Sequence, residues 1–147
     1  MRMFGLLIGL YLFFNLATGC SRSTSLAFVV QGDSQMNNGG HFAIVRIYQL
    51  SNDTRFLNAD FDAFWQDDET LLADEIIPGT KQQIALYPED PLPQKVDVEE
   101  NTKFIAFAAN LYNPDGDNWR KIYPVALLNK EGVTVWVRAN QLMVDIP

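Results

Sequence analysis

The chain has a single cysteine, Cys20, and a single histidine, His41, among its 147 residues. One thiol cannot form an intramolecular disulfide, so the fold must rest on packing alone. A metal site needs several His, Cys or carboxylate ligands at a suitable spacing, and nucleophilic catalysis needs a Ser or Cys beside an oriented base. The sequence has no such ligand set and no Gly-x-Ser-x-Gly motif. We therefore expect no metal, no cofactor and no enzyme activity, with His41 at the edge of a loop.

Basic residues are also scarce, because 11 Lys and Arg stand against 18 Asp and Glu, for a net charge of −7. Binding to nucleic acid depends on Lys and Arg contacts with phosphates, so this composition argues against a nucleic-acid partner. It also argues against a polybasic segment that would hold the protein on an anionic membrane surface.

One long apolar run stands at the start of the chain. Met3 to Phe14 contains 12 residues without a charge, after Arg2. A membrane-spanning helix needs about 20 residues, so this run fits the hydrophobic region of a signal peptide better. The small residues Ala17, Thr18 and Gly19 follow, as they do before a cleavage site.

The sequence Leu-Ala-Thr-Gly-Cys that ends at Cys20 resembles a bacterial lipobox, in which the cysteine becomes linked to diacylglycerol. We therefore predict a signal peptide at 1–19, lipidation of Cys20 and a lipidated tether at 20–25. Ser21 stands where an Asp would retain such a protein in the inner membrane, which favours the periplasmic face of the outer membrane. The alternatives are an ordinary signal peptide with a chance cysteine, or an uncleaved anchor.

The next segments predict two strands around a loop. The strand formers of Leu26–Gln31 and His41–Leu50 flank Gly32–Gly40, which is rich in Gly and Asn. Antiparallel pairing of the two strands across this loop is the simplest interpretation. Ala43, Val45, Ile47 and Gln49 alternate along the second strand and are expected to face inward.

An acidic segment follows, with seven carboxylates and no base between Asp60 and Glu75. Phe61, Phe64 and Trp65 have helical spacing, which predicts a helix with these residues in the core and Asn58 or Asp60 as its cap. The stretch from Leu71 to Ile77 is a second short helix or a strand. Paired carboxylates can serve acid–base chemistry, but a solvated helix face is favoured, and docking of a basic partner remains an alternative.

The rest of the chain is β in character. Strands are predicted at 81–88, 103–112, 119–128 and 133–147, with a Pro-rich acidic connection at 89–102. The oxygen side chains of Asn113, Asp115 and Asp117 have the spacing of a calcium loop, but its required Gly and Glu positions do not match, which favours a turn. Several short strands with one helical insertion indicate a mainly β, two-sheet sandwich as a single domain at 26–147.

Three motifs then resemble one family, the outer-membrane lipoproteins (TssJ) of type VI secretion systems. The first is Val45 to Asp74, with an arginine-containing strand that ends in Tyr-Gln-Leu, followed by the helix start Asn-Ala-Asp-Phe and paired acids. The second is the apolar strand and turn that end in Trp119-Arg120. The lipobox is the third. A Pro-Gly that the family often carries after the middle strand is Pro88-Glu89 here.

The resemblance implies a transthyretin-like β-sandwich with a small helical insertion, and a role as outer-membrane anchor of the trans-envelope secretion complex. It implies a TssM-type inner-membrane protein as partner, in a membrane complex with TssL, and no small-molecule substrate. The family's contact loop corresponds here to the partner-binding loop Gly32, Asp33, Ser34, Gln35, Met36, Asn37, Asn38, Gly39 and Gly40.

We expect this loop to add little to the fold and Met36 to be exposed. The alternative function is a generic periplasm-facing lipoprotein that binds a small ligand or a cell-wall component between its sheets. A polar-lined pocket would favour that alternative, and a protruding loop over a filled core would favour the anchor.

Overall fold

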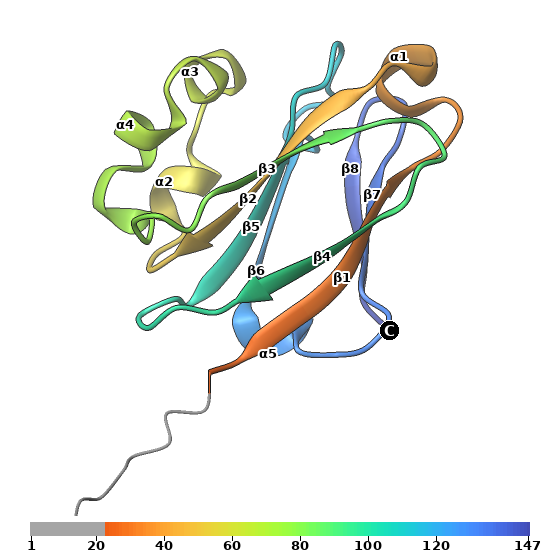
Figure 1. Ribbon diagram of the computed structural model, residues 1–147. Coiled ribbons are helices and arrows are strands. Elements are labelled where there is room, and N and C mark those ends of the chain that lie inside the picture. Colours follow the sequence, from red (N-terminus) through yellow and green to blue (C-terminus); the bar gives the residue numbers. More distant parts are fainter. Residues whose placement is uncertain (1–22) are drawn as a thin grey trace, which may run out of the picture.

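The computed structural model describes residues 23–147, which form two four-stranded sheets packed face to face (Figure 1). The two-sheet sandwich predicted from the sequence is therefore confirmed. The predictions for the signal peptide and for Cys20 lie outside the described residues. Within the described part of the chain, no helix is long and apolar enough to cross a membrane.

The first sheet has the strand order β4-β1-β7-β8. Its strands are β1 (Ser25–Gly32), β4 (Leu92–Asp97), β7 (Thr134–Val137) and β8 (Leu142–Asp145). β1 runs parallel to β7, and the other two pairs are antiparallel.

The second sheet has the order β3-β2-β5-β6 and is antiparallel throughout. Its strands are β2 (Ala43–Leu50), β3 (Gln82–Leu86), β5 (Phe104–Ala109) and β6 (Arg120–Pro124). A single turn of helix, α5 (Val125–Leu128), follows β6 where the sequence predicted more strand.

Two sequence predictions about the strands are wrong. β1 and β2 do not pair with each other, because they belong to different sheets and the chain crosses between the sheets in the loop that joins them. The predicted connection at 89–102 contains β4, an edge strand. Pro93 is tolerated there because an edge strand has one side of its backbone free of ladder bonds.

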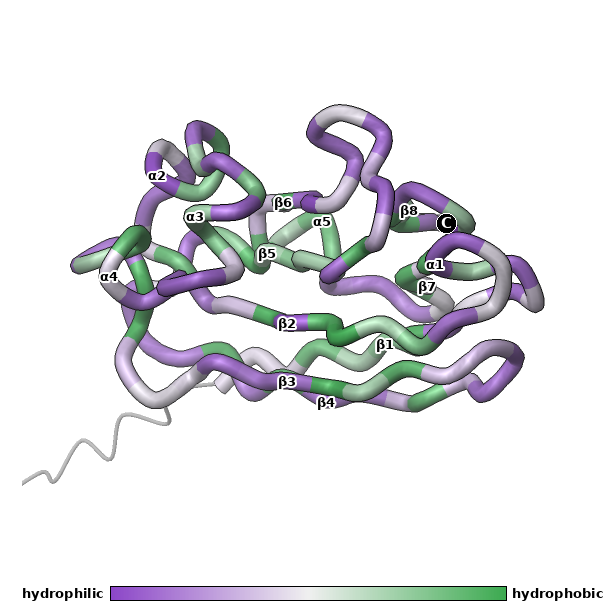
Figure 2. Tube along the Cα trace, turned by 90° about the horizontal axis from the view of Figure 1, so that it is seen from above, coloured by the Kyte–Doolittle hydropathy of each residue, from purple (hydrophilic) through white to green (hydrophobic). Residues whose placement is uncertain are grey.

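The core lies between the sheets. The central strand β5 is apolar along its whole length, whereas the edge strands β3 and β4 carry both polar and apolar residues (Figure 2). Phe28 of β1 meets Phe107 of β5 edge to face across the core, with ring centroids 5.3 Å apart. The inward set predicted for the second strand is confirmed, because Ala43, Val45, Ile47 and Gln49 are all buried.

A helical insertion between β2 and β3 lies beside the second sheet (Figure 1). It contains α2 (Thr54–Leu57), α3 (Phe61–Gln66), α4 (Asp68–Leu72) and the 3₁₀ turn η1 (Ala73–Glu75). The predicted cap of α3 is confirmed, because the carboxylate of Asp60 accepts a hydrogen bond from the Ala63 amide at 3.1 Å. The stretch from Leu71 to Ile77, for which the sequence allowed a helix or a strand, is helical as far as Glu75, and Ile76 forms an isolated β-bridge with Leu50.

An aromatic cluster joins this insertion to the sheet. Trp119 is 1% exposed, and its ring lies 5.0 Å from that of Phe64 and 6.4 Å from that of Phe56, between centroids. Phe64 is fully buried, whereas Phe61 and Trp65 are only partly buried against the core. The prediction that Phe61 and Trp65 are core residues therefore holds only in part, because α3 turns one side of these rings outward.

Arg120, the residue after Trp119, fixes the end of α2. Its guanidinium donates hydrogen bonds to the carbonyl oxygens of Phe56 at 2.7 Å and Ala59 at 2.6 Å, and pairs with Asp117 at 3.1 Å. The last carbonyls of a helix have no partner within it, so a buried cation is well suited to satisfy them. The Trp-Arg pair thus holds the insertion on the sandwich.

We expect Trp119→Ala to lower the free energy of unfolding by about 3–5 kcal/mol, the usual cost of truncating a buried large aromatic side chain. The matched control is Tyr112→Ala, because this ring is 66% exposed, and its loss should stay within about 0.5 kcal/mol. Urea unfolding followed by circular dichroism measures both values. If both variants lost the same free energy of unfolding, the aromatic cluster around Trp119 would not be a main source of stability.

Candidate protein-binding site

The predicted partner-binding loop is a defined structure at the end of the sandwich opposite the start of β1 (Figure 1). It contains the short element α1 (Met36–Gly40), in which left-handed residues interrupt the helix. The φ angles are 47° at Asn37, 65° at Asn38, 96° at Gly39 and 93° at Gly40. Asn and Gly adopt this region most readily, so the sequence allows this path at little cost.

Two residues of the loop belong to the core rather than to the surface. Met36 is 0% exposed and Asn37 is 2% exposed. A Cβ atom placed on Gly32 would lie 2.1 Å from the sulfur of Met36, so the methionine needs a glycine beside it. The expectations that Met36 is exposed and that the loop adds little to the fold are therefore wrong. An apolar residue between polar neighbours in a loop is the signal that could have shown this.

The side chain of Asn37 ties its loop to the neighbouring loops. Its amide group donates to the Phe42 carbonyl at 2.7 Å, and its carbonyl oxygen accepts from the Tyr112 amide at 2.8 Å. The backbone amides of Asn37 and Asn38 donate to the carbonyls of Arg138 and Ala139 in the β7–β8 turn. Three segments far apart in the sequence thus meet around one buried amide.

An ion pair supports the loop from its other side. Asp33 and Arg138 are 2.9 Å apart, and the guanidinium of Arg138 lies 4.1 Å from the ring centroid of Trp136. The second carboxylate oxygen of Asp33 accepts from the Gln35 amide at 3.0 Å. The loop is therefore held at both ends before any partner arrives. Its exposed residues are Ser34, Gln35, Asn38 and Gly39.

Four rings surround this loop, and we call them the aromatic patch: His41, Phe42, Tyr87 and Tyr112. Phe42 is 48% exposed, Tyr87 54% and Tyr112 66%. Phe42 stacks on Tyr87 with centroids 5.8 Å apart, and His41 meets Tyr112 edge to face at 5.1 Å. His41 is exposed beside the loop, as predicted.

Phe42, Tyr87 and Tyr112 are not among the site residues predicted from the sequence. Each lies at or just outside a strand end, where strand periodicity no longer says which side chains are covered. The turn residues Pro88 and Asn113, directly after the two tyrosines, were the available sign that these rings leave the sheet.

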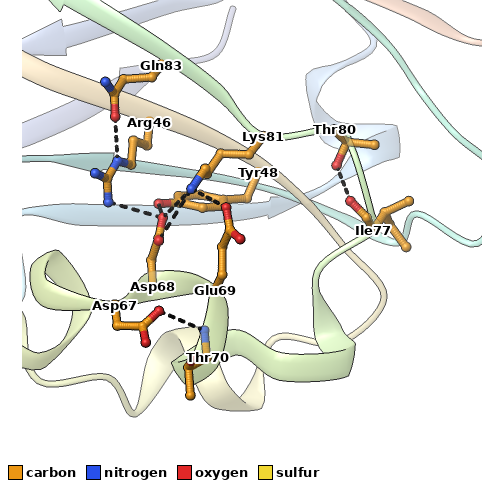
Figure 3. A network of polar contacts seen from close by, with 10 residues as sticks. All are labelled: Arg46, Tyr48, Asp67, Asp68, Glu69, Thr70, Ile77, Thr80, Lys81 and Gln83. Carbon is orange, nitrogen blue, oxygen red and sulfur yellow. Dashed lines mark hydrogen bonds and ion pairs between the residues drawn. The ribbon is translucent and has the colours of Figure 1, made fainter.

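The acidic segment is the other candidate, and its central carboxylate has a structural role (Figure 3). Asp68 is 6% exposed and accepts from the Tyr48 hydroxyl at 2.5 Å and from Arg46 at 3.1 Å, with Lys81 at 3.4 Å. Burial, together with the bond to Asp68, raises the pKa of Tyr48 above its ordinary value, so the phenol remains a donor.

The expectation of a solvated acidic face is therefore wrong for Asp68 and also for Glu75, which is 8% exposed and accepts from the Arg55 amide. It holds for Asp67, whose exposed carboxylate caps α4 by accepting from the Thr70 amide at 3.2 Å. Hydrogen bonding from Thr70, through its side chain first and then through its backbone amide, lowers the pKa of Asp67. Because its central carboxylates are committed to internal donors, the segment offers no free acid–base pair there.

The Asn113–Asn118 segment is a turn, as predicted. Asp117 pairs with Arg120, which leaves it poorly placed as a cation ligand. Among residues 23–147, no group of three His, Cys, Asp or Glu side chains could hold a metal ion.

A family model described as type VI secretion lipoprotein, VasD, EvfM, TssJ, VC_A0113 matches residues 24–140 of the chain. The fold is similar to that of the type VI lipoprotein TssJ1 from Pseudomonas aeruginosa, with a TM-score of 0.73 and 17% identity over 85% of this chain and 97% of that one. This likeness confirms the transthyretin-like sandwich that the sequence motifs implied. A search of curated proteins gave no match.

Two further structures contain a chain of similar fold. One is described as the type VI protein TssM C-terminal domain from EAEC, with a TM-score of 0.72 and 22% identity over 84% of this chain and 98% of that one. The other is described as a type VI membrane complex, with a TM-score of 0.75 and 24% identity over 84% of this chain and 99% of that one.

We expect Asn37→Ala to lower the free energy of unfolding by about 2–3 kcal/mol, because it removes two side-chain hydrogen bonds. Alanine also adopts a positive φ less readily than asparagine, whose side chain can hydrogen-bond to nearby backbone. Asn37→Gly should lose less, since glycine adopts this backbone freely. The control Asn38→Gly should stay within about 0.5 kcal/mol, because Asn38 is exposed and also has positive φ. Thermal and urea unfolding measure all three. If Asn37→Ala were as stable as Asn38→Gly, the loop would not be tied down as described.

Proposed function

Because the chain belongs to the type VI secretion lipoprotein (TssJ) family, we propose that its partner-binding loop and aromatic patch bind the periplasmic part of a TssM-type inner-membrane protein. Membership makes the protein a non-enzymatic, outer-membrane lipoprotein of the type VI secretion membrane complex. The proposal concerns the partner and the surface that the partner meets. It extends to TssL, which TssM would link to this chain within the same complex.

The observation that carries the proposal is the cluster of exposed aromatic rings on an already ordered end of the domain. Tyr112 and Tyr87 are more than half exposed and Phe42 nearly half. Aromatic residues dominate the binding energy of protein interfaces because they bury a large area with few rotatable bonds. The ties around Asn37 support the proposal as well, since a preordered loop loses little conformational entropy on binding.

The similar folds support the same partner. One lies in a structure described as a TssM C-terminal domain, and another in a type VI membrane complex. This similarity shows a shared fold, and we propose the TssM-type partner on that basis.

We propose further that residues 1–19 are a signal peptide and that Cys20 carries the lipid at the start of a short tether, 20–25. Each buried methylene contributes roughly 0.8 kcal/mol to membrane binding, so several acyl chains make an effectively permanent anchor. The anchor and the aromatic patch would then connect the outer membrane with a protein of the inner membrane.

The alternative function, a ligand- or cell-wall-binding lipoprotein, needs space between the sheets. In residues 23–147 that space is occupied by buried side chains from both sheets, among them Phe28, Ile47, Phe107 and Val135. A ligand there would have to displace these side chains, so the geometry favours the anchor.

We predict that Cys20→Ser abolishes lipidation and releases the protein from the outer membrane, as an uncleaved or soluble form. Metabolic labelling with a palmitate analogue, followed by membrane fractionation, tests this directly. Ser21→Ala is the matched control and should be labelled like the wild type. Label that persists in the Cys20→Ser variant would exclude this lipidation site.

We predict that Tyr112→Ala weakens binding of the periplasmic part of a TssM-type partner by about 2 kcal/mol, roughly thirtyfold in Kd, as truncation of an interface hot spot does. Phe42→Ala should act in the same direction. Isothermal titration calorimetry measures the affinity, and thermal melting confirms that the variants are folded.

Leu57→Ala is the control, because Leu57 is 47% exposed on α2, away from the patch. Its affinity should equal that of the wild type. If Asp62→Lys on α3 abolished binding while both patch variants bound normally, the interface would lie on the helical insertion instead.

A further inference from the structure

The described chain begins at the end of the sandwich opposite the aromatic patch (Figure 1). Thr24 accepts a hydrogen bond from the Val98 amide at 2.8 Å, which fixes the position where the chain enters β1. Four residues lie between Cys20 and Ser25, and an extended chain spans at most about 18 Å over the five steps that join the two positions. A lipid on Cys20 would therefore hold this end of the domain close to the membrane.

This end carries exposed apolar surface. Leu127 of α5 is 47% exposed, and Ala126 beside it is exposed as well. Next to α5, a groove of about 480 Å³ extends from Ser25 along β1, with Ala27, Pro93 and Val133 in its walls. Leu128 also lines this groove, so the helical turn and the groove form one continuous surface.

The charges at this end are mixed. The exposed lysines Lys103 and Lys130 stand beside the exposed acids Glu99, Glu100 and Glu131. Such a surface has no strong attraction to anionic headgroups, and any adhesion to a bilayer must come from apolar contact. Apolar contact does not weaken as salt is added, whereas headgroup attraction does.

We infer that the α5 end of the domain is a second membrane contact, with Leu127 inserted into the phospholipid leaflet that holds the Cys20 anchor. This inference rests on the proposed lipidation, because a short tether is what brings α5 to the bilayer. A lipid chain alone leaves the domain free to tilt. A second contact some distance from the attachment point restricts that tilt and gives the domain one orientation.

The orientation has a consequence for partner binding. β1 runs from the membrane end to the partner-binding loop, and its eight residues span about 26 Å at the usual rise of a strand. With α5 on the bilayer, the aromatic patch points away from it into the periplasm. A partner that approaches from the inner membrane then meets the patch directly.

The test places a tryptophan at each end of the full-length lipidated protein, reconstituted into vesicles of phosphatidylethanolamine and phosphatidylglycerol with brominated acyl chains. Bromine quenches only nearby tryptophans. Leu127→Trp should lose fluorescence relative to vesicles without bromine, beyond the loss seen for the wild type with its native tryptophans. The extra loss should stay the same when the salt concentration is raised.

The matched control is Leu57→Trp, because Leu57 has the same 47% exposure and lies on the helical insertion. Tyr112→Trp reports on the far end, and neither variant should show extra quenching. If all three behave like the wild type while the protein floats with the vesicles, lipidation holds and the second contact does not. Equal extra quenching of all three would show a domain without preferred orientation, which also overturns the inference. A protein that does not float with the vesicles would instead contradict the lipidation itself.

Discussion

The side-chain amide of Asn37 closes one end of the sandwich, and the arrangement of the loops there depends on it. β1 and β2 lie in different sheets, so the chain must cross the end of the core between them. A crossing of this kind exposes backbone groups that need partners. The side-chain NH2 of Asn37 donates to the Phe42 carbonyl, and its side-chain oxygen accepts from the Tyr112 amide. Met36 is buried next to it in the core. The aromatic patch is therefore presented by a part of the molecule that also stabilises the fold.

The helical insertion is held by the same kind of interaction, since buried polar groups are costly unless they are satisfied. Asp68 has donors in Tyr48, Arg46 and Lys81, and Arg120 has acceptors in two carbonyls and Asp117. Removing one partner of such a pair costs more than the pair contributes, because the other is left buried and unpaired. This is how a chain with no disulfide in its described part fixes 24 residues of insertion, from Asn52 to Glu75, against a sheet.

The sequence was sufficient to predict what depends on local pattern. The alternation of Ala43, Val45 and Ile47 predicted that these side chains face inward, and Asp60 before an apolar stripe predicted the start of α3. Both predictions are confirmed. Which strands pair with each other could not be predicted from local pattern, because strands that are consecutive in the sequence need not lie in the same sheet. The burial of Asp68 could not be seen either, since its partners Tyr48 and Lys81 come from two other segments. The exposed rings of the patch were missed for a related reason, as strand periodicity ends where they begin.

The two ends of the domain present different kinds of surface. At the patch, an ion pair in the partner-binding loop and hydrogen bonds to the backbone of Phe42 and Tyr112 fix the segments that carry the exposed rings. At the α5 end, the exposed surface is apolar and its charges are mixed. An ordered aromatic surface suits a specific protein partner, because shape and orientation decide the affinity. An apolar surface whose charges are of both signs suits a fluid bilayer, because contact with lipid chains requires no complementary shape. The strand β1 connects these two surfaces directly, so a constraint on one end sets the direction of the other.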